Sequence, residues 1–226
     1  MNSSRIIEDQ NKIYRDNFLK YKDSPLGTFQ NNRETQHLRF EYIVKPFIDI
    51  LNEKVSFHDF GCGVCDLHAY LNSKGIKHDY SGTEVLDEMI EYAKEKHPKI
   101  KIYKRDILKE LVSEKYDIVV FSGGLYFPGN IPHDEWKQFV FQIVSKMFEM
   151  CKTGISFNLL STYNTYADKN LFFLDPKEMF DHCCKNLSRF VSLDQCYPLY
   201  EWTISIFREE FISSKYPQEA FKKYLK

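Results

Sequence analysis

The sequence predicts an α/β fold whose sheet is mainly parallel and doubly wound, with helices on both faces. Runs of β-branched and aromatic residues alternate with helical patterns along the chain, which is the order that forms parallel sheets. Residues 116–122 are almost continuously apolar, as in a central strand that is covered on both faces. A glycine turn, Gly61-Cys-Gly63, separates the run that starts at Val55 from a helix-compatible segment.

Each element follows from its pattern and its boundary signals. A first helix ends at the break over residues 23–27, and a second begins near Asn32 and ends or kinks at Pro46. Asp175 is the expected N-cap of a later helix. The expected helices cover residues 4–21, 32–46, 65–71, 86–96, 134–151 and 176–184. The expected strands cover residues 55–60, 77–84, 100–104, 116–122, 154–160, 189–193 and 201–208, and the last two are expected to pair antiparallel.

The chain of 226 residues is long enough for one α/β domain with a substantial core and short for two. No repeat, low-complexity segment or domain linker interrupts it. We therefore expect a single domain over residues 1–226. Within it, N-terminal helices over 1–53 precede a core over 54–208 and a helical tail over 209–226.

Composition and charge argue against several function classes. A net charge of −1, with both signs interspersed, provides no basic surface of the kind that binds nucleic acid. No run is long and apolar enough to span a membrane, and the first nine residues are too polar for a signal peptide. The six cysteines form no disulfide framework, which favours reduced thiols and a cytoplasmic location. Cys62 and Cys65 have the spacing of a redox or zinc pair, but no second pair completes a metal site, so no metal is expected.

The glycine turn indicates a cofactor with a nucleoside part. Gly61 and Gly63 can adopt positive φ and let a ligand approach the bare backbone, while the helix start behind them directs N–H groups at it. A dinucleotide site requires a third glycine three places after the second, where this chain has Asp66. Asp59, just before the turn, suits a ligand with an ammonium group better than one with a pyrophosphate. The pattern therefore favours S-adenosylmethionine over NAD or FAD.

The stretch His58-Asp-Phe-Gly-Cys-Gly-Val-Cys65 resembles motif I of the class I S-adenosylmethionine-dependent methyltransferases, which is usually written Leu-Asp-Leu-Gly-Cys-Gly-x-Gly. Cys62 matches the motif, and Cys65 stands where the family usually has its third glycine. The resemblance implies a seven-stranded sheet with one antiparallel strand near its end. It also implies S-adenosylmethionine as methyl donor and S-adenosylhomocysteine as product. At motif level it covers residues 55–125.

The ends of the next three strands carry residue types that this family uses, and ligands of open α/β sheets bind beyond these ends. The resemblance implies an acid for the ribose hydroxyls, an acid and an apolar neighbour for the adenine, and a backbone turn for the methionine part. These cofactor-binding residues are, in order, Glu84 with Val85 beside it, Asp106 and Ile107, and Ser122 and Gly123.

Plain structural roles are the alternatives for these acids. Asp106 could cap a helix that begins near Ile107. Glu84 could be a surface acid, and Asp59 could be a solvated acid at the end of its strand.

The segment before the sheet is expected to lie over the mouth of the pocket as an N-terminal helical lid. Its residues 26–29 and 36–40 precede the first strand. Gln36 and Arg39 are three residues apart and share a helix face, from which Arg39 could pair with the carboxylate of the cofactor or with an acidic substrate. An ordinary surface arginine is the alternative.

Transfer of an activated methyl group mainly requires alignment of donor and acceptor. Candidates for a base or an orienting group follow the fourth and fifth strands: Tyr126, His133, Asn158 and Tyr163. A histidine titrates in the useful range, although a loop histidine can equally be a plain surface residue. Asn158 could donate a hydrogen bond to the acceptor.

The methyl acceptor is expected to be a small metabolite, with transfer to a nitrogen or an oxygen atom. Enzymes that methylate amino groups of bases or of glutamine typically carry Asn/Asp-Pro-Pro-Tyr/Phe after the fourth strand, whereas this chain has Ser122-Gly-Gly-Leu125. A sugar, a sugar nucleotide or a phosphorylated amino alcohol would fit. The alternatives are a non-catalytic S-adenosylmethionine-binding protein and a nicotinamide-dependent oxidoreductase, against which Asp66 argues.

Overall fold

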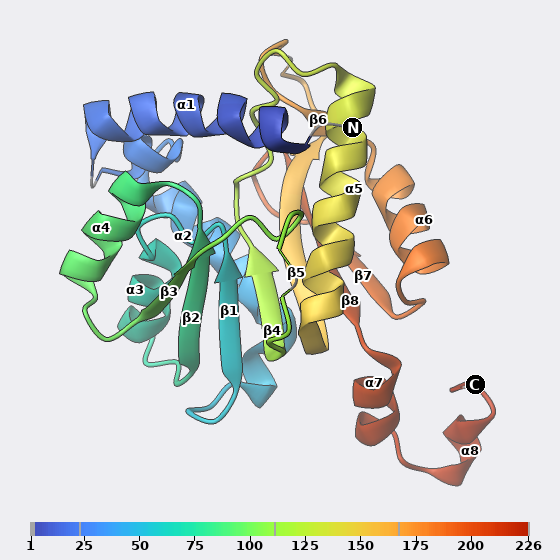
Figure 1. The fold of residues 1–226 in the computed structure, drawn as a ribbon. Helices are drawn as coiled ribbons and strands as arrows, with labels where there is room; N and C mark the ends of the chain where they lie inside the picture. Colours follow the sequence, from blue (N-terminus) through green and yellow to red (C-terminus); the bar gives the residue numbers. More distant parts are fainter. Residues whose placement is uncertain (1–2, 23, 111, 167, 226) are drawn as a thin grey trace.

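A twisted sheet forms the centre of the computed structural model, which describes residues 3–22, 24–110, 112–166 and 168–225. Its main strands are β1 (Ser56–Phe60), β2 (Asp79–Glu84), β3 (Lys101–Lys104), β4 (Tyr116–Phe121), β5 (Cys151–Ser161), β7 (Val191–Asp194) and β8 (Glu201–Phe207). They lie in the order β3-β2-β1-β4-β5-β8-β7 (Figure 1). The strands are parallel except β8, which runs antiparallel to both β5 and β7. The predicted doubly wound sheet with one antiparallel strand is confirmed.

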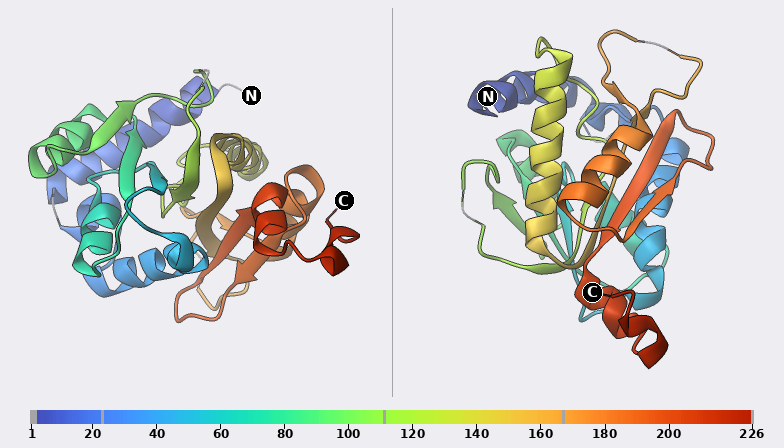
Figure 2. Two further views of the ribbon diagram at one scale, coloured as in Figure 1. Left: turned by 90° about the horizontal axis from the view of Figure 1, so that it is seen from below. Right: turned by 90° about the vertical axis from the view of Figure 1, so that its right-hand side faces the viewer.

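The helices cover both faces of this sheet, as Figure 2 shows for α2 and α5 on opposite sides. On one face lie α2 (Arg33–Val44), the 3₁₀ helix η2 (Lys45–Ile50), α3 (Asp66–Ser73) and α4 (Asp87–Lys96). On the other lie α5 (His133–Met150) and α6 (Pro176–Asn186). β4 explains why both faces must be covered: Ile118 and Val120 point into one core, and Val119 and Phe121 point into the other.

The N-terminal segment lies across the carboxyl ends of the strands, as expected of a lid. It consists of α1 (Ser3–Tyr21) and the 3₁₀ helix η1 (Pro25–Thr28), and the arrows of β1, β2 and β4 point toward α1 in Figure 1. Ile6 joins the core beside α5, and Phe18 packs with Leu86 and Met89 near the tip of β2. α1 is therefore packed against the sheet edge where a ligand is expected.

Boundary residues behave largely as their chemistry predicts. The Asn32 side chain accepts a hydrogen bond from the Thr35 backbone N–H at 2.8 Å, and Asp175 caps α6 by accepting from the Lys177 N–H at 2.8 Å. At Pro46, which lacks an N–H, α2 gives way to η2 instead of ending in a loop. The two-residue strand β6 (Phe173–Leu174), which pairs with β5, was not predicted because so short a segment has no periodicity.

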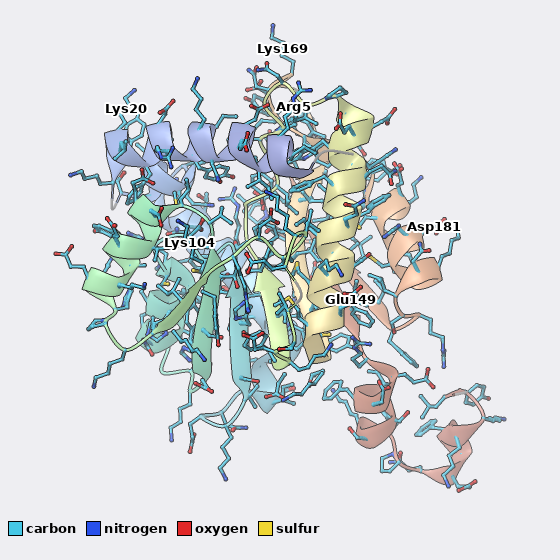
Figure 3. All side chains as sticks on the ribbon, in the orientation of Figure 1. Arg5, Lys20, Lys104, Glu149, Lys169 and Asp181 are labelled. Atoms are coloured by element: carbon cyan, nitrogen blue, oxygen red, sulfur yellow. The ribbon has the colours of Figure 1, made fainter. Side chains whose placement is uncertain are left out.

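The C-terminal helices α7 (Glu209–Lys215) and α8 (Glu219–Lys222) project away from the sheet on the side opposite α1 (Figures 1 and 2). Figure 3 shows charged side chains of both signs on separate elements, such as Lys20 on α1 and Asp181 on α6, each of which is exposed. Among the described residues, no helix combines the length and the apolar character that crossing a membrane requires.

Candidate functional site

Two adjoining hollows lie beyond the carboxyl ends of the strands, beneath α1. The Asp106 hollow, lined among others by Val85, Asp106 and Ile107, has an empty volume of about 730 Å³. The Asp59 hollow, lined among others by Asp59 and Ser122, has about 540 Å³. The residues that line both hollows are Tyr14, Gly61, Glu84, Met89 and Gly124, so the two form one crevice.

The glycine turn forms part of the floor of the crevice. Gly61 has φ +65°, and a Cβ atom there would lie 2.7 Å from the Phe121 ring, so both conformation and space require glycine. Gly63 also has positive φ, at +53°. Cys65, at the position of the family's third glycine, is fully buried and keeps the left-handed conformation with φ +62° and ψ +34°. Cys65 therefore adopts a left-handed conformation that glycine takes readily, although it carries a side chain.

Glu84 holds the turn against the tip of β2. Its Oε2 accepts a hydrogen bond from the Gly63 N–H at 2.9 Å, and its Oε1 accepts from the N–H groups of Val85 at 2.7 Å and Leu86 at 3.0 Å. Burial raises the pKa of Glu84, and these three backbone donors oppose the rise. Glu84 is 7% exposed, which is incompatible with the alternative of a surface acid.

Asp59 is a buried acid at the end of β1, not a solvated one. It is 3% exposed and accepts a hydrogen bond from the Tyr80 hydroxyl at 2.5 Å. Burial raises the pKa of Asp59 to about 7, and the nearby Glu84 and Asp66 add to the rise. This cluster of carboxyl groups makes the Asp59 hollow suited to a cationic group.

Two buried oxygen atoms in the crevice have no hydrogen-bond partner among the described residues: Asp106 Oδ2 and Ser122 Oγ. Asp106 Oδ1 accepts from the Leu108 N–H at 3.0 Å, and Lys109 Nζ lies 3.4 Å from Oδ2. A turn, not a helix, follows Asp106, so helix capping does not account for this acid. Since buried polar atoms are normally satisfied, the two oxygens mark places for ligand groups. With the bare glycine turn and the acid cluster, they fit an adenosyl amino acid.

The lid residues Gln36 and Arg39 have different positions. Gln36 lines the Asp59 hollow, and its Nε2 donates to Asp66 Oδ2 at 2.9 Å. Arg39 lines neither hollow, because its guanidinium is engaged with Glu201 on β8, where Nε donates to Oε1 at 2.7 Å. Burial alone would lower the pKa of Arg39, but the neighbouring Tyr126 and Glu201 raise it. The expectation that Arg39 pairs with a cofactor carboxylate is corrected, and so is the alternative of a surface arginine.

Asn158 and Tyr126 belong to the same buried network. Glu201 Oε2 accepts from the Tyr126 hydroxyl at 3.1 Å and from Asn158 Nδ2 at 2.7 Å, while Asn158 Oδ1 accepts from the Gly123 N–H at 3.1 Å. Asn158 Nδ2 also contacts the Tyr126 hydroxyl oxygen. Neither side chain lines a hollow. The polar atoms expected to meet an acceptor are thus bound within the protein, and they support the turn at Gly123 from behind.

His133 and Tyr163 are surface residues, which corrects the expectation that they lie beside the acceptor. The His133 side chain is 59% exposed and its Nε2 lies 3.3 Å from the Phe173 carbonyl oxygen. Tyr163 is 55% exposed, and Lys177 lies over its ring. Neither residue lines a hollow. Both follow strands that carry site residues, but their loops turn away from the crevice.

Sequence reasoning missed the residues through which the lid meets the floor. Tyr14 donates to the Gly123 carbonyl at 3.4 Å, and Gln10 Nε2 donates to the Gly124 carbonyl at 3.2 Å. Gln30 lines the Asp59 hollow and is 5% exposed. Glu201, the acceptor of the buried network, was read only as the start of a strand. The sequence predicted a lid over the pocket, but no pattern in it indicated which side chains of α1 contact the floor.

Comparisons with known proteins agree with this fold. No protein-family model matches the chain. Over 153 residues, which are 67% of this chain and 92% of the relative, it is 29% identical to a Mycobacterium tuberculosis protein that carries a provisional methyltransferase name.

Solved methyltransferase structures superpose on most of the chain. The DhpI–SAM–HEP complex has a TM-score of 0.63 at 14% identity, over 90% of this chain and 97% of that one. The N-methyltransferase NodS from Bradyrhizobium japonicum WM9, crystallised with S-adenosylhomocysteine, has a TM-score of 0.57 at 13% identity, over 88% and 98%. Magnesium protoporphyrin IX methyltransferase from Synechocystis PCC 6803 has 0.56 at 15% identity, over 88% and 97%. At these identities the structures show the fold. In fold, in motif I at the tip of β1 and in sequence, the chain is similar to the class I S-adenosylmethionine-dependent methyltransferases.

Proposed function

We propose that the protein transfers the methyl group of S-adenosylmethionine to a nitrogen or oxygen atom of a small metabolite, such as a sugar, a sugar nucleotide or a phosphorylated amino alcohol. The observation that carries the proposal is the row of strand tips along one crevice. A bare glycine turn, a buried acid after β2 and a partly buried acid after β3, one of whose oxygens has no hydrogen-bond partner among the described residues, follow one another in the order that an adenosyl sulfonium requires.

Each residue has a definite part in this proposal. Glu84 receives the ribose hydroxyls, Asp106 and Ile107 hold the adenine, and Asp59 attracts the ammonium group of the methionine part. Ser122 and Gly123 lie against that part. The cofactor supplies an already activated methyl group, so the protein contributes chiefly by aligning donor and acceptor and by excluding water, an effect worth several kcal/mol. Tyr14, Gly61 and Gly124 line both hollows, which supports a position of the reacting sulfur beside them.

Calorimetry with S-adenosylmethionine, S-adenosylhomocysteine and NAD tests the cofactor. We expect the two adenosyl ligands to bind and NAD not to bind. Glu84→Ala removes the ribose acceptor and leaves three backbone N–H groups without their partner, so it should weaken S-adenosylhomocysteine binding more than about 30-fold. Glu91→Ala, which removes an exposed acid from α4, is the matched control. Binding of NAD, or an unchanged affinity in Glu84→Ala, would contradict the proposal.

A methylation screen tests catalysis separately from binding. The protein is incubated with radiolabelled S-adenosylmethionine and fractions of a small-metabolite extract, and labelled products are separated by chromatography. We expect a labelled amine or hydroxyl compound of low mass. Tight cofactor binding without any labelled product would instead favour the non-catalytic adenosylmethionine-binding protein.

A further inference from the structure

The amide of Gln30 is held in one orientation by a chain of buried contacts that starts at Glu201. Arg39 donates to Glu201 Oε1 from Nε, and its NH1 donates to Gln30 Oε1. Gln30, Arg39 and Glu201 are 5%, 8% and 1% exposed. A guanidinium has donors only, so it fixes the oxygen of the Gln30 amide on its own side. The Nε2 donor must then point the other way.

That direction is the Asp59 hollow. Gln30 lines this hollow, and its Nε2 is so near Gly123 that a Cβ atom on the glycine would lie 2.8 Å from it. Gly123 has φ +75°, and its N–H is held by Asn158, so the backbone here is set by the same network. The hollow thus presents a fixed amide donor beside Gly123, in addition to its acid cluster.

The other polar lid side chains that line this hollow, Tyr14, Thr28 and Gln36, already have hydrogen-bond partners. The Tyr14 hydroxyl donates to the Gly123 carbonyl and the Thr28 hydroxyl donates to the Pro25 carbonyl. Gln36 Nε2 donates to Asp66, and Gln36 Oε1 accepts from Arg33 NH1 at 2.9 Å. Asp59, Asp66 and Glu84 supply negative charge for an ammonium group, but a bound amino acid also carries a carboxylate. A carboxylate requires donors, and it would be repelled by the acids. Gln30 Nε2 is such a hydrogen-bond donor.

We propose that Gln30 donates from Nε2 to the carboxylate of the amino-acid end of the cofactor, and that Arg39 and Glu201 are positioning residues that keep its amide turned toward the hollow. This inference rests on the proposed cofactor. It assigns to β8, at the far side of the sheet from the glycine turn, a part in cofactor recognition. Arg39 and Glu201 act through Gln30 and touch no ligand.

The test compares two ligands that differ at one end. S-adenosylhomocysteine has the amino-acid end, whereas 5′-methylthioadenosine keeps the adenosyl thioether and lacks it. Gln30→Glu preserves size and the oxygen that Arg39 contacts, but replaces the donor by a second acceptor. We expect this variant to weaken S-adenosylhomocysteine at least about 30-fold and to leave 5′-methylthioadenosine within about twofold, measured by calorimetry. Gln30→Met, which has no charge, should weaken S-adenosylhomocysteine about tenfold with the same selectivity.

The positioning part is tested with Arg39→Lys. Lysine keeps a cation for Glu201 but lacks the planar fork that reaches two partners at once, so the Gln30 amide is released. We expect about a tenfold loss for S-adenosylhomocysteine, none for 5′-methylthioadenosine, and the wild-type far-ultraviolet circular dichroism spectrum. If Arg39→Lys fails to fold, Arg39→Met/Glu201→Met, which buries no unpaired charge, takes its place. Gln138→Leu, at an exposed position of α5, is the control.

The outcomes separate the two proposals. If the wild-type protein does not bind S-adenosylhomocysteine, the proposed function fails. If it binds, and Gln30→Glu binds S-adenosylhomocysteine as tightly as the wild type, only the inference about Gln30 fails. Equal loss for both ligands in Arg39→Lys or its replacement would show that the network supports the fold alone, which overturns the positioning role.

Discussion

The floor of the crevice is assembled from strand tips that follow one another closely along the chain, whereas its lid is anchored by contacts between distant residues. The floor groups Asp59, Glu84 and Asp106 belong to successive turns, and Glu84 meets Gly63 across 21 positions. On the lid side, the bond between Arg39 and Glu201 spans 162 positions. The floor residues can therefore be found from their order along the chain, whereas the contacts that anchor the lid can be found only from the three-dimensional structure.

The largest expected effect is on the floor. Gly61→Ala introduces a Cβ atom at 2.7 Å from the Phe121 ring at a residue with positive φ, so the turn must move. We expect S-adenosylhomocysteine affinity to fall more than about 100-fold by calorimetry. Gly75→Ala is the matched control, because its φ of +68° is similar but no atom lies within 4 Å of the added Cβ. Equal effects of the two variants would mean that backbone strain, not the shape of the floor, decides binding.

The next effect is on the pH dependence of stability. The pKa of Asp59, raised to about 7, lies above its value in the unfolded chain, so the folded protein binds this proton more tightly. The free energy of unfolding should fall as pH rises from about 4 to about 7, by at most about 1.4 kcal/mol per pH unit from this group. Urea unfolding of the wild type and of Asp59→Asn at several pH values measures this pH dependence. The part of the pH dependence that comes from Asp59 should be absent in the variant. If the difference in free energy of unfolding between the wild type and Asp59→Asn does not change with pH, the raised pKa of Asp59 is contradicted.

The lid side is tested by Asn158→Ala. The substitution removes one donor to Glu201 and the acceptor for the Gly123 N–H, both of which are buried. We expect a loss of about 2 kcal/mol in the free energy of unfolding by urea, with Asn130→Ala in an exposed loop as control. Unchanged stability combined with lost methylation would return Asn158 to the acceptor-contacting role that its place after β5 first indicated.

The smallest effect concerns the missing third glycine. Cys65 holds φ +62° with a side chain, which costs about 1 kcal/mol relative to glycine. Cys65→Gly and Cys65→Ala both remove the thiol, so their difference isolates the conformation. We expect Cys65→Gly to be more stable than Cys65→Ala by about 1 kcal/mol in urea unfolding. The opposite order would mean that the backbone at this position adapts to a side chain.

The same division explains how much could be predicted. The alternation of strands and helices follows from periodic patterns. The antiparallel strand and the floor acids follow from the family resemblance, and the acids are expected together because the strand tips of a parallel sheet lie at one edge. Arg39 was expected at the pocket for its charge, yet Glu201 draws it into the interior. His133 and Tyr163 were expected there for following site strands, but their loops lead to the surface. Gln30 and Tyr14 lie in segments without a motif, so their contacts could not be read from spacing.

The contact between Arg39 and Glu201 has a consequence for the order of events during synthesis. Every floor residue has been translated by the turn that follows β4, but the partner of Arg39 is added about 80 positions later, in β8. A nascent chain that ends before Glu201 contains the floor residues but lacks the buried ion pair that links α2 to β8. The orientation of the Gln30 amide therefore depends on a contact that forms only after Glu201 has been synthesised.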